Sequence, residues 1–287
     1  MIAQVIKIVS NQYTLETQDK KNIEAFALGK LRLDKSPKVG DYVEYEEYEE
    51  KYGITKILPR KTDLIRPQIA NVDQALIVMS ALEPEFSISL VDRICALIHF
   101  ANITPIICVT KLDLVDKNHS IYAIIKEYQE AGYTVLCNGN NALDVRFDTI
   151  FKDKITVLTG QSGVGKSSLL NSLNPEFKLQ TQDISKALGR GKHTTRHVEL
   201  FKIHGGYVAD TPGFSSLDFS YMEEEDLVQS ILEFKPYVGK CKFNDCKHEH
   251  EPGCAIKQAI LDNKISKHRY QSYLEIKKII NDRRKKI

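Results

Sequence analysis

Apolar and polar residues alternate over short stretches in the first 63 residues of the chain. The alternation is clearest at residues 4–9, 13–15 and 41–45, and turns are expected near Gly29, Gly40 and Gly53. A period of two with β-branched and aromatic residues is typical of strands. Residues 1–63 therefore predict a small antiparallel β-barrel, resembling an OB-fold. Such a barrel can bind RNA, or it can serve only as a packing unit.

Over residues 64–220 the pattern changes to nearly continuous apolar runs that alternate with helical spacing. The apolar runs are residues 74–81, 105–109, 155–158 and 207–209, and the helical patterns are residues 90–98 and 122–128. Strands that read as continuously apolar are buried on both faces, as in a parallel sheet covered by helices. This region therefore predicts a doubly wound parallel α/β domain.

Beyond residue 220 the pattern turns to helix, and the charge becomes uneven. Residues 264–287 hold nine Lys or Arg against two acidic residues, or +7, whereas the first 263 hold 31 basic and 36 acidic residues, or −5. We expect residues 221–287 to form a helical domain that ends in a basic helix. That helix is either a solvated face or a nucleic-acid contact. The candidate phosphate contacts are Lys277, Lys278, Arg283, Arg284, Lys285 and Lys286.

The composition is that of an ordinary soluble protein, with 42% hydrophobic and 27% charged residues over 287 positions. No apolar run approaches the roughly 20 residues of a membrane helix, and residues 1–7 lack the layout of a signal peptide. We therefore expect a cytoplasmic protein without a membrane partner. A monomer is also expected.

The clearest chemical motif is a glycine-rich loop between the apolar run at residues 155–158 and a helical pattern at residues 168–173. It fits the P-loop, whose backbone N–H groups and helix amino terminus face phosphate. Lys166 is expected to reach the β- and γ-phosphates, and Ser167 to ligate Mg²⁺. The expected nucleotide contacts here are Gly160, Gln161, Ser162, Gly163, Val164, Gly165, Lys166, Ser167 and Ser168.

A second motif, Thr110-Lys111-Leu112-Asp113, follows the apolar run at residues 105–109. Ligands of open α/β sheets bind beyond the carboxyl ends of the strands. The Asp113 carboxylate can accept from guanine N1–H and the exocyclic amine, a donor pair that adenine lacks, while the Lys111 stem can lie along the base. The usual Ser-Ala partner motif is absent, and residues 137–140 read Cys-Asn-Gly-Asn. A backbone amide there can still meet guanine O6.

Two later segments fit the switches that sense a γ-phosphate. Asp210-Thr-Pro-Gly213 follows the apolar run at residues 207–209, so Asp210 is expected to hold the Mg²⁺ shell and the Gly213 amide to sense γ-phosphate. Residues 191–196 supply the switch-one threonine, either Thr194 or Thr195, with Thr195 preferred.

The group that orients the attacking water stays open. Ras-like enzymes often carry glutamine after the glycine of this motif, but here Phe214 follows, and its side chain cannot hydrogen-bond a water. Slow intrinsic hydrolysis is therefore expected. His193, next to the threonines, is the first candidate for orienting water, ahead of His197 or a group supplied by a partner.

A cluster of metal-ligand residue types lies in the last domain. Cys241, Cys246, His248 and Cys254 supply three thiolates and one imidazole, the set for a closed tetrahedral zinc site. With four ligands, the zinc would be structural, one per chain. From spacing alone, His250 could replace His248, and the alternative to a metal is a set of buried free thiols.

The order of the motifs is unusual, because the guanine motif precedes the P-loop. With this order, the DTPG segment and the run from Cys241 to Cys254, the chain resembles the small ribosomal subunit biogenesis GTPase family, RsgA, also called YjeQ. The likeness extends to the leading barrel and to the linker Leu58-Pro-Arg-Lys with Arg66-Pro67. It covers essentially the whole chain.

The resemblance implies a fold and a function. The fold is a circularly permuted P-loop GTPase domain between an N-terminal OB-fold barrel and a C-terminal helical zinc-binding domain. The family function is to bind the small ribosomal subunit and its rRNA late in maturation, with GTP hydrolysis stimulated by the subunit and driving release. GTP with Mg²⁺ is the implied substrate, and the implied zinc ligands are Cys241, Cys246, His248 and Cys254.

Two other functions compete with this interpretation. One is an RNA-binding module for which GTP is a regulatory ligand and turnover is incidental, which Phe214 keeps open. The other is a P-loop kinase or ATPase, against which the guanine motif and the DTPG segment argue. A further hypothesis is that the permutation couples γ-phosphate sensing at Gly213 to the C-terminal domain, since the chain runs from this glycine directly into that domain.

Overall fold

The computed structural model describes residues 1–28, 36–48, 51–65, 68–139, 142–177, 199–210 and 218–284. For Ala142, Asp210 and Arg284 only the backbone is described. The chain forms two compact units, one of residues 1–78 with 141–215 and the other of residues 79–140 with 216–287. Within the described ranges, no helix is long and apolar enough to span a membrane. The three expected domains, residues 1–63, 64–220 and 221–287, stay a prediction.

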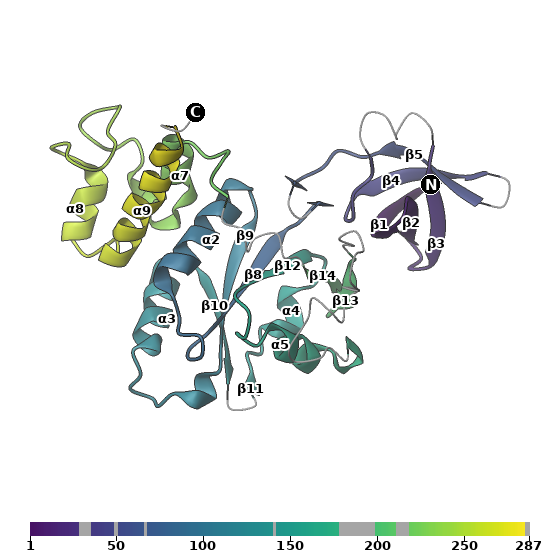
Figure 1. Ribbon diagram of the computed structural model, residues 1–287, viewed down its shortest axis with the longest axis horizontal. Helices are drawn as coiled ribbons and strands as arrows, with labels where there is room; N and C mark the ends of the chain where they lie inside the picture. Colours follow the sequence, from purple (N-terminus) through teal and green to yellow (C-terminus); the bar gives the residue numbers. More distant parts are fainter. Residues whose placement is uncertain are drawn as a thin grey trace. The chain divides into compact units, whose positions relative to one another are not determined.

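The first five strands close into a barrel, as the alternating pattern predicted (Figure 1). Its core consists of the inward side chains of each strand, including Val5, Leu15, Val43 and Ile54, all fully buried. The strands are β1 Ile2–Val9, β2 Gln12–Thr17, β3 Asn22–Ala27, β4 Tyr42–Tyr48 and β5 Lys51–Ile57.

The barrel differs from the expectation in one pairing. The strand order is β1-β2-β3-β5-β4. Strand β3 pairs with β5 in parallel, whereas the pairs β1–β2, β1–β4, β2–β3 and β4–β5 are antiparallel. The chain leaves β3, passes through residues 28–41 and enters the β4–β5 hairpin, so β5 runs in the direction of β3. The prediction of a purely antiparallel barrel was therefore wrong. Alternation of side chains does not report strand direction.

A seven-stranded sheet has the order β11-β10-β9-β8-β12-β14-β13. Its first strand in the chain, β8, is buried at every residue, as expected for a strand covered on both faces. The strands are β8 Gln74–Ser80, β9 Thr104–Thr110, β10 Thr134–Gly139, β11 Ala142–Leu143, β12 Ile155–Thr159, β13 Phe201–Ile203 and β14 Gly206–Asp210. The short strands β6 Asp63–Leu64 and β7 Ile69–Ala70 pair separately.

The sheet is mixed rather than wholly parallel. Strands β8, β12 and β14 run parallel, as do β9 and β10, but β13 pairs antiparallel with β14 through a tight hairpin. The associated helices are α2 Ile88–Phe100, α3 Ile121–Glu130, α4 Phe147–Ile150 and α5 Lys166–Leu173, with one-turn 3₁₀ helices at Leu112–Leu114 and Pro175–Phe177.

The barrel contacts the β13–β14 hairpin of its own unit. Lys7 of β1 pairs with Glu199 at 2.9 Å, just before β13. Glu16 of β2, only 4% exposed, pairs with Lys202 at 2.6 Å and accepts a hydrogen bond from the Tyr207 hydroxyl. Burial acts to raise the pKa of Glu16, but these hydrogen bonds outweigh burial and lower the pKa. The charged carboxylate therefore anchors the barrel to the hairpin.

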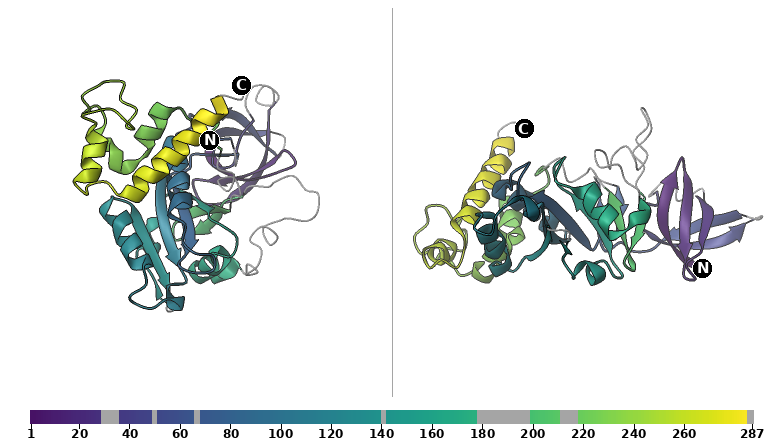
Figure 2. Two further views of the ribbon diagram at one scale, coloured as in Figure 1. Left: turned by 60° about the vertical axis from the view of Figure 1, so that its left-hand side comes forward. Right: turned by 90° about the horizontal axis from the view of Figure 1, so that it is seen from below.

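The C-terminal helices pack on α2 within the second unit, and Figure 1 and Figure 2 both show α9 beside α2 and α7. A capping box of Glu223 and Asp226 starts α7, which satisfies its free N–H groups. The shared core includes Ala96 of α2, Phe234 and Ile276. The helices are α7 Glu224–Ser230, the 3₁₀ helix Leu232–Tyr237, α8 Ala255–Leu261 and α9 Lys267–Arg284.

A buried arginine on α9 joins the C-terminal helices to α2. Arg269 is 2% exposed, and its guanidinium contacts the carboxylates of Asp92 on α2 and Glu233. The guanidinium carbon also lies 4.5 Å from the centre of the Tyr128 ring, which is cation–π distance. Burial raises the pKa of Glu233 and lowers the pKa of Arg269. The contacts between opposite charges offset that cost.

Arg269→Met is expected to lower the free energy of unfolding by about 3–5 kcal/mol, because it leaves two buried carboxylates without their cation. Lys278→Met, an exposed change on the same helix, is the control and should change stability by less than about 0.5 kcal/mol. Urea unfolding of the two variants and the natural protein measures both effects. Equal losses in the two variants would contradict the role given to Arg269.

Candidate functional site

The P-loop lies between β12 and α5, as predicted. Gly160 follows β12 with φ +140°, and a Cβ at this position would be 2.1 Å from the Val78 carbonyl oxygen. Only glycine therefore lets the loop pass so close to β8. Val164 is fully buried and anchors the turn, and α5 begins at Lys166.

The Lys166 side chain folds over the loop that precedes it. Its ammonium donates to the carbonyl oxygens of Gly160 at 2.8 Å and Gln161 at 2.5 Å. Ser167 is 6% exposed at the first turn of α5, whereas Ser162 and Ser168 are exposed. A cation, N–H groups of a helix amino terminus and a hydroxyl are thus gathered in one loop. This arrangement can bind a phosphate chain.

The guanine motif lies at the end of β9. The Thr110 hydroxyl donates to the Met79 carbonyl at 3.2 Å, so the first residue of the motif is tied to β8. Lys111 has a left-handed backbone with φ 57°, and the turn Leu112–Leu114 follows. Leu112 is buried and Asp113 is exposed. The Leu112 side chain therefore anchors the turn, while the Asp113 carboxylate is accessible to a ligand.

The predicted switch residues fall mainly outside the described ranges. Asp210 is the last residue of β14, in register with Leu158 of β12, and only its backbone is described. Other candidates lie within residues 178–198 and 211–217, which are not described: Thr194, Thr195, His193, His197, Gly213 and Phe214. Their roles stay predictions.

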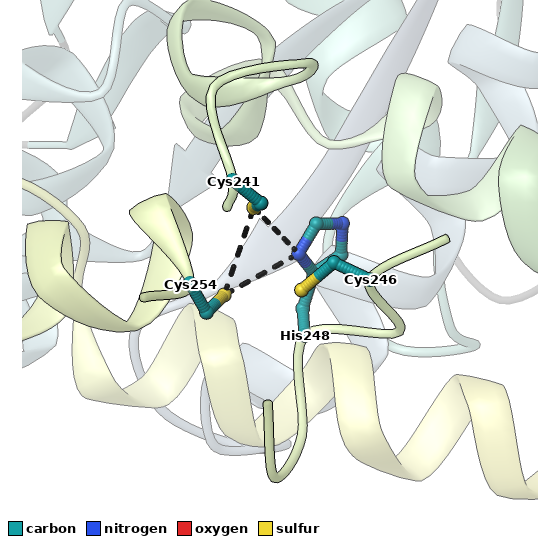
Figure 3. Close-up of side chains that lie close together, drawn as sticks. All are labelled: Cys241, Cys246, His248 and Cys254. Carbon is teal, nitrogen blue, oxygen red and sulfur yellow. Dashed lines mark hydrogen bonds between the residues drawn. The ribbon is translucent and has the colours of Figure 1, made fainter. Parts of the chain in front are cut away.

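The metal cluster is assembled as the sequence predicted. One ligand atom from each of Cys241, Cys246, His248 and Cys254 lies within 4.8 Å of the others, and Figure 3 shows the side chains converging. Cys241 Sγ is 3.5 Å from His248 Nδ1 and 3.9 Å from Cys254 Sγ, while His248 Nδ1 is 3.4 Å from Cys254 Sγ. His250 is not part of this set, and 94% of its side chain is exposed.

The spacing of these atoms fits a tetrahedral zinc ion. Zn–S bonds of about 2.3 Å and Zn–N bonds of about 2.0–2.1 Å place two sulfur ligands about 3.8 Å apart, and a sulfur and a nitrogen about 3.5 Å apart. Without a metal, burial raises the pKa of the Cys246 thiol to about 12. Metal binding must therefore displace protons from thiols.

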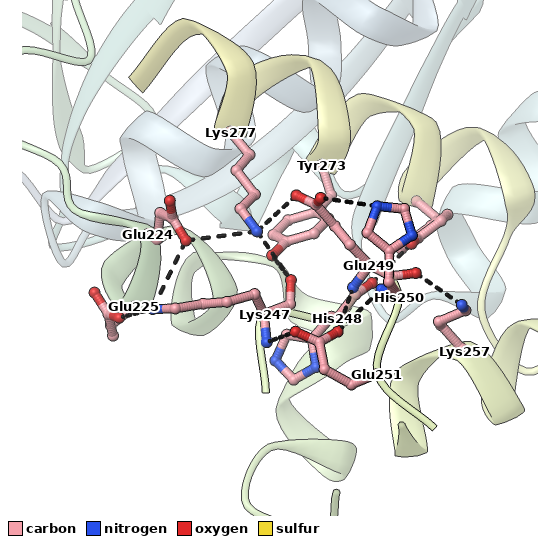
Figure 4. A network of polar contacts seen from close by, with 11 residues as sticks. Glu224, Glu225, Lys247, His248, Glu249, His250, Glu251, Lys257, Tyr273 and Lys277 are labelled. Carbon is pink, nitrogen blue, oxygen red and sulfur yellow. Dashed lines mark hydrogen bonds and ion pairs between the residues drawn. The ribbon is translucent and has the colours of Figure 1, made fainter. Parts of the chain in front are cut away.

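Three side chains of α9 hold the backbone of the loop that carries the metal cluster, residues 239–254, here called the cluster loop; Figure 4 shows two of them, Tyr273 and Lys277. The Tyr273 hydroxyl and the Lys277 ammonium both donate to the Lys247 carbonyl, at 2.9 and 3.0 Å, and the Tyr270 hydroxyl donates to the His248 carbonyl at 2.7 Å. Sequence reasoning missed these supporting residues. Their spacing of three and four places them on one helix face, which is the signal that could have found them.

The prediction that Lys277 contacts nucleic-acid phosphate was wrong. Lys277 is 4% exposed and pairs with Glu249 at 2.7 Å and Glu224 at 3.5 Å (Figure 4). Arg283 also has an internal role, because its Nη1 donates to the Phe219 carbonyl at 2.7 Å. Lys278 is exposed as expected. The side chain of Arg284 and residues Lys285 and Lys286 lie outside the described part of the chain.

Comparisons with known proteins agree with this arrangement. The family model described as RsgA GTPase matches residues 57–220. The chain is 46% identical to the small ribosomal subunit biogenesis GTPase RsgA of Bacillus subtilis and 47% identical to that of Bacillus pumilus, covering 98% of this chain and 97% of each relative.

Solved structures of similar proteins share the whole fold. The crystal structure of YloQ, a circularly permuted GTPase, matches with a TM-score of 0.82 at 40% identity, over 98% of this chain and 95% of that one. The structure of YjeQ from Thermotoga maritima matches with a TM-score of 0.85 at 31% identity, over 97% and 98%. The chain therefore belongs to the RsgA family of circularly permuted GTPases.

Proposed function

We propose that this protein hydrolyses GTP to GDP and phosphate and assists the late maturation of the small ribosomal subunit. The subunit stimulates hydrolysis, and hydrolysis drives release of the protein from the subunit. The observation that carries the proposal is the P-loop after β12, with Lys166 over its carbonyls, in a chain that also places TKLD after β9. The relatives named above are small ribosomal subunit biogenesis GTPases.

The P-loop residues are proposed to bind and orient the phosphates. The Lys166 ammonium exchanges its contacts with Gly160 and Gln161 for the β- and γ-phosphate oxygens, and the N–H groups of residues 160–168 surround the chain of phosphates. Negative charge that develops on these oxygens during transfer is then met by cations and N–H groups already in place. This electrostatic stabilisation of the transition state is the main contribution of the protein to the rate enhancement.

Ser167, Asp210 and Thr195 are proposed to hold Mg²⁺ with the nucleotide. When bound with the nucleotide, the ion would supply positive charge against the phosphate oxygens. The Gly213 amide senses the γ-phosphate, and His193 orients the attacking water. Thr110, Lys111, Leu112 and Asp113 bind the base, with the Asp113 carboxylate accepting from guanine N1–H and the exocyclic amine.

Cys241, Cys246, His248 and Cys254 are proposed to hold one structural zinc ion. The set is closed, with three thiolates and one imidazole and no position left for a reactant. The zinc stabilises the loop that α9 holds by its Lys247 and His248 carbonyls. It takes no part in hydrolysis.

The ribosomal RNA surface is proposed to include exposed cations of the C-terminal helices and the cluster loop. Lys264, Lys267 and Lys278 are exposed. The Lys242 ammonium lies 5.6 Å from the centre of the Phe243 ring, and Phe243 is 42% exposed. Exposed cations attract phosphates, and an exposed aromatic ring can stack on a base. We propose that the protein binds the small subunit in the cytoplasm and does so as a monomer.

Purified small subunits are expected to accelerate GTP hydrolysis by about tenfold or more, since Phe214 leaves the free protein without a water-orienting glutamine. The assay compares no subunit, small subunit and large subunit at several salt concentrations, and acceleration should fall as salt weakens phosphate contacts. No acceleration by small subunits would favour an RNA-binding module with incidental turnover. Equal competition by ATP would contradict the role of Asp113.

A further inference from the structure

The turn of the TKLD motif, Leu112–Leu114, is held from one side by the loop between β8 and α2. The Lys111 ammonium donates to the Glu83 carbonyl. That loop is tied in turn to the end of β8, because the hydroxyl of Ser80 donates to the Pro84 carbonyl at 2.6 Å, and Ser80 is fully buried. The Ser80 hydroxyl thus holds the loop whose Glu83 carbonyl receives Lys111 of the TKLD motif.

On its other side the turn is in contact with the end of β10. A Cβ on Gly139 would be 2.7 Å from Leu112 Cβ, 2.9 Å from the backbone nitrogen of Asp113 and 3.0 Å from Leu112 Cα. These atoms belong to the turn itself and cannot rotate away. Gly139 does not have a left-handed backbone, so backbone conformation does not require glycine here. The requirement comes from the close approach to Leu112 and Asp113.

We propose that Gly139 and Ser80 are specificity-positioning residues, which hold the Asp113 carboxylate where it meets both donors of guanine. The absence of a side chain at Gly139 lets β10 close against the turn, while Ser80 fixes the loop that receives Lys111. A methyl group at position 139 must push the turn by several tenths of an ångström. Recognition geometry tolerates only about 0.5 Å of such error. The inference rests on the proposed GTP binding.

Gly139→Ala is expected to weaken GDP binding by about tenfold, as for loss of hydrogen bonds to a charged acceptor. Inosine diphosphate lacks the exocyclic amine, so it loses one contact with Asp113 where GDP loses two. The preference for GDP over inosine diphosphate should therefore fall toward 1. Titration calorimetry with GDP, inosine diphosphate and ADP measures these ratios on the full-length protein, beside Asp113→Ala as the reference for complete loss.

Matched variants separate positioning from general damage to the fold. Gly239→Ala lies at φ +75° with no atom within 4 Å of the added methyl, so it strains the backbone and should lower stability without changing the nucleotide ratio. Ser80→Ala should weaken GDP binding several-fold and reduce the same ratio, and Ser80→Thr, which keeps a hydroxyl, should restore both.

The outcomes are distinct. A natural ratio in folded Gly139→Ala overturns the inference, and if that variant fails to fold, a natural ratio in Ser80→Ala overturns it. A reduced ratio in Gly139→Ala, or in Ser80→Ala where Gly139→Ala does not fold, supports it if the Gly239→Ala control keeps the natural ratio. If the natural protein itself does not prefer GDP over ADP, or if Asp113→Ala binds GDP normally, the proposed function fails first.

Discussion

Replacing Lys166 by alanine is expected to reduce GTP hydrolysis by at least about a hundredfold, the scale on which removal of one group that stabilises transition-state charge is felt. In the structure the ammonium donates to two carbonyl oxygens of its own loop, those of Gly160 and Gln161. The fold should therefore survive the change. Single-turnover hydrolysis with and without small subunits, together with circular dichroism, measures both effects.

Lys152→Ala is the matched control for this variant, because Lys152 is an exposed lysine of the same unit, before β12. It should hydrolyse GTP at the natural rate. Full turnover by Lys166→Ala would refute the assignment of the P-loop, and loss of turnover in both variants would show that the assay reports surface charge instead.

Removal of the proposed zinc ion is expected to have the largest effect on stability. Structural zinc in small domains contributes about 10–16 kcal/mol of apparent binding free energy at neutral pH, which is coupled to folding. The loop of residues 239–254 should therefore unfold when a chelator removes zinc, and the core that α8 and α9 share with it should loosen. Metal analysis and thermal unfolding before and after chelation measure this, and the P-loop should still bind phosphate.

Two histidines in one loop give this prediction an internal control. His248 contributes Nδ1 to the cluster, whereas the side chain of His250 is 94% exposed. His248→Ala should lose zinc and lower the unfolding temperature, and His250→Ala should do neither. The reverse result would show that the ligand set is wrong.

The elements that carry chemistry could be predicted from the sequence because their signals are local. A strand, a glycine-rich turn and a helix start follow one another at residues 155–173, and four metal-ligand side chains fall within fourteen positions. The apolar run predicted at residues 74–81 is β8, Gln74–Ser80. Where backbone geometry and side-chain chemistry are specified by neighbours in the chain, pattern and structure agree.

The contacts that join distant segments could not be predicted in the same way. Lys277 has the same sequence character as Lys278, yet one is buried in ion pairs and the other is exposed. Charge alone does not tell which side of a helix packs. The pairing of Arg269 with Asp92 and the parallel contact of β3 with β5 likewise depend on tertiary structure, which leaves no local period in the sequence.

The packing of α9 on α2 also bears on how the protein folds as it is synthesised. Ser89 of α2 donates to Glu275 of α9 at 2.8 Å across 186 residues of chain. The face of α2 that includes Ala96 is covered by residues of the segment 219–280, which are synthesised long after α2. Until then this apolar face remains uncovered on the nascent chain. The chain order therefore delays completion of the second unit until α7, α8 and α9 have been synthesised, and that step depends on long-range contacts, which form slowly.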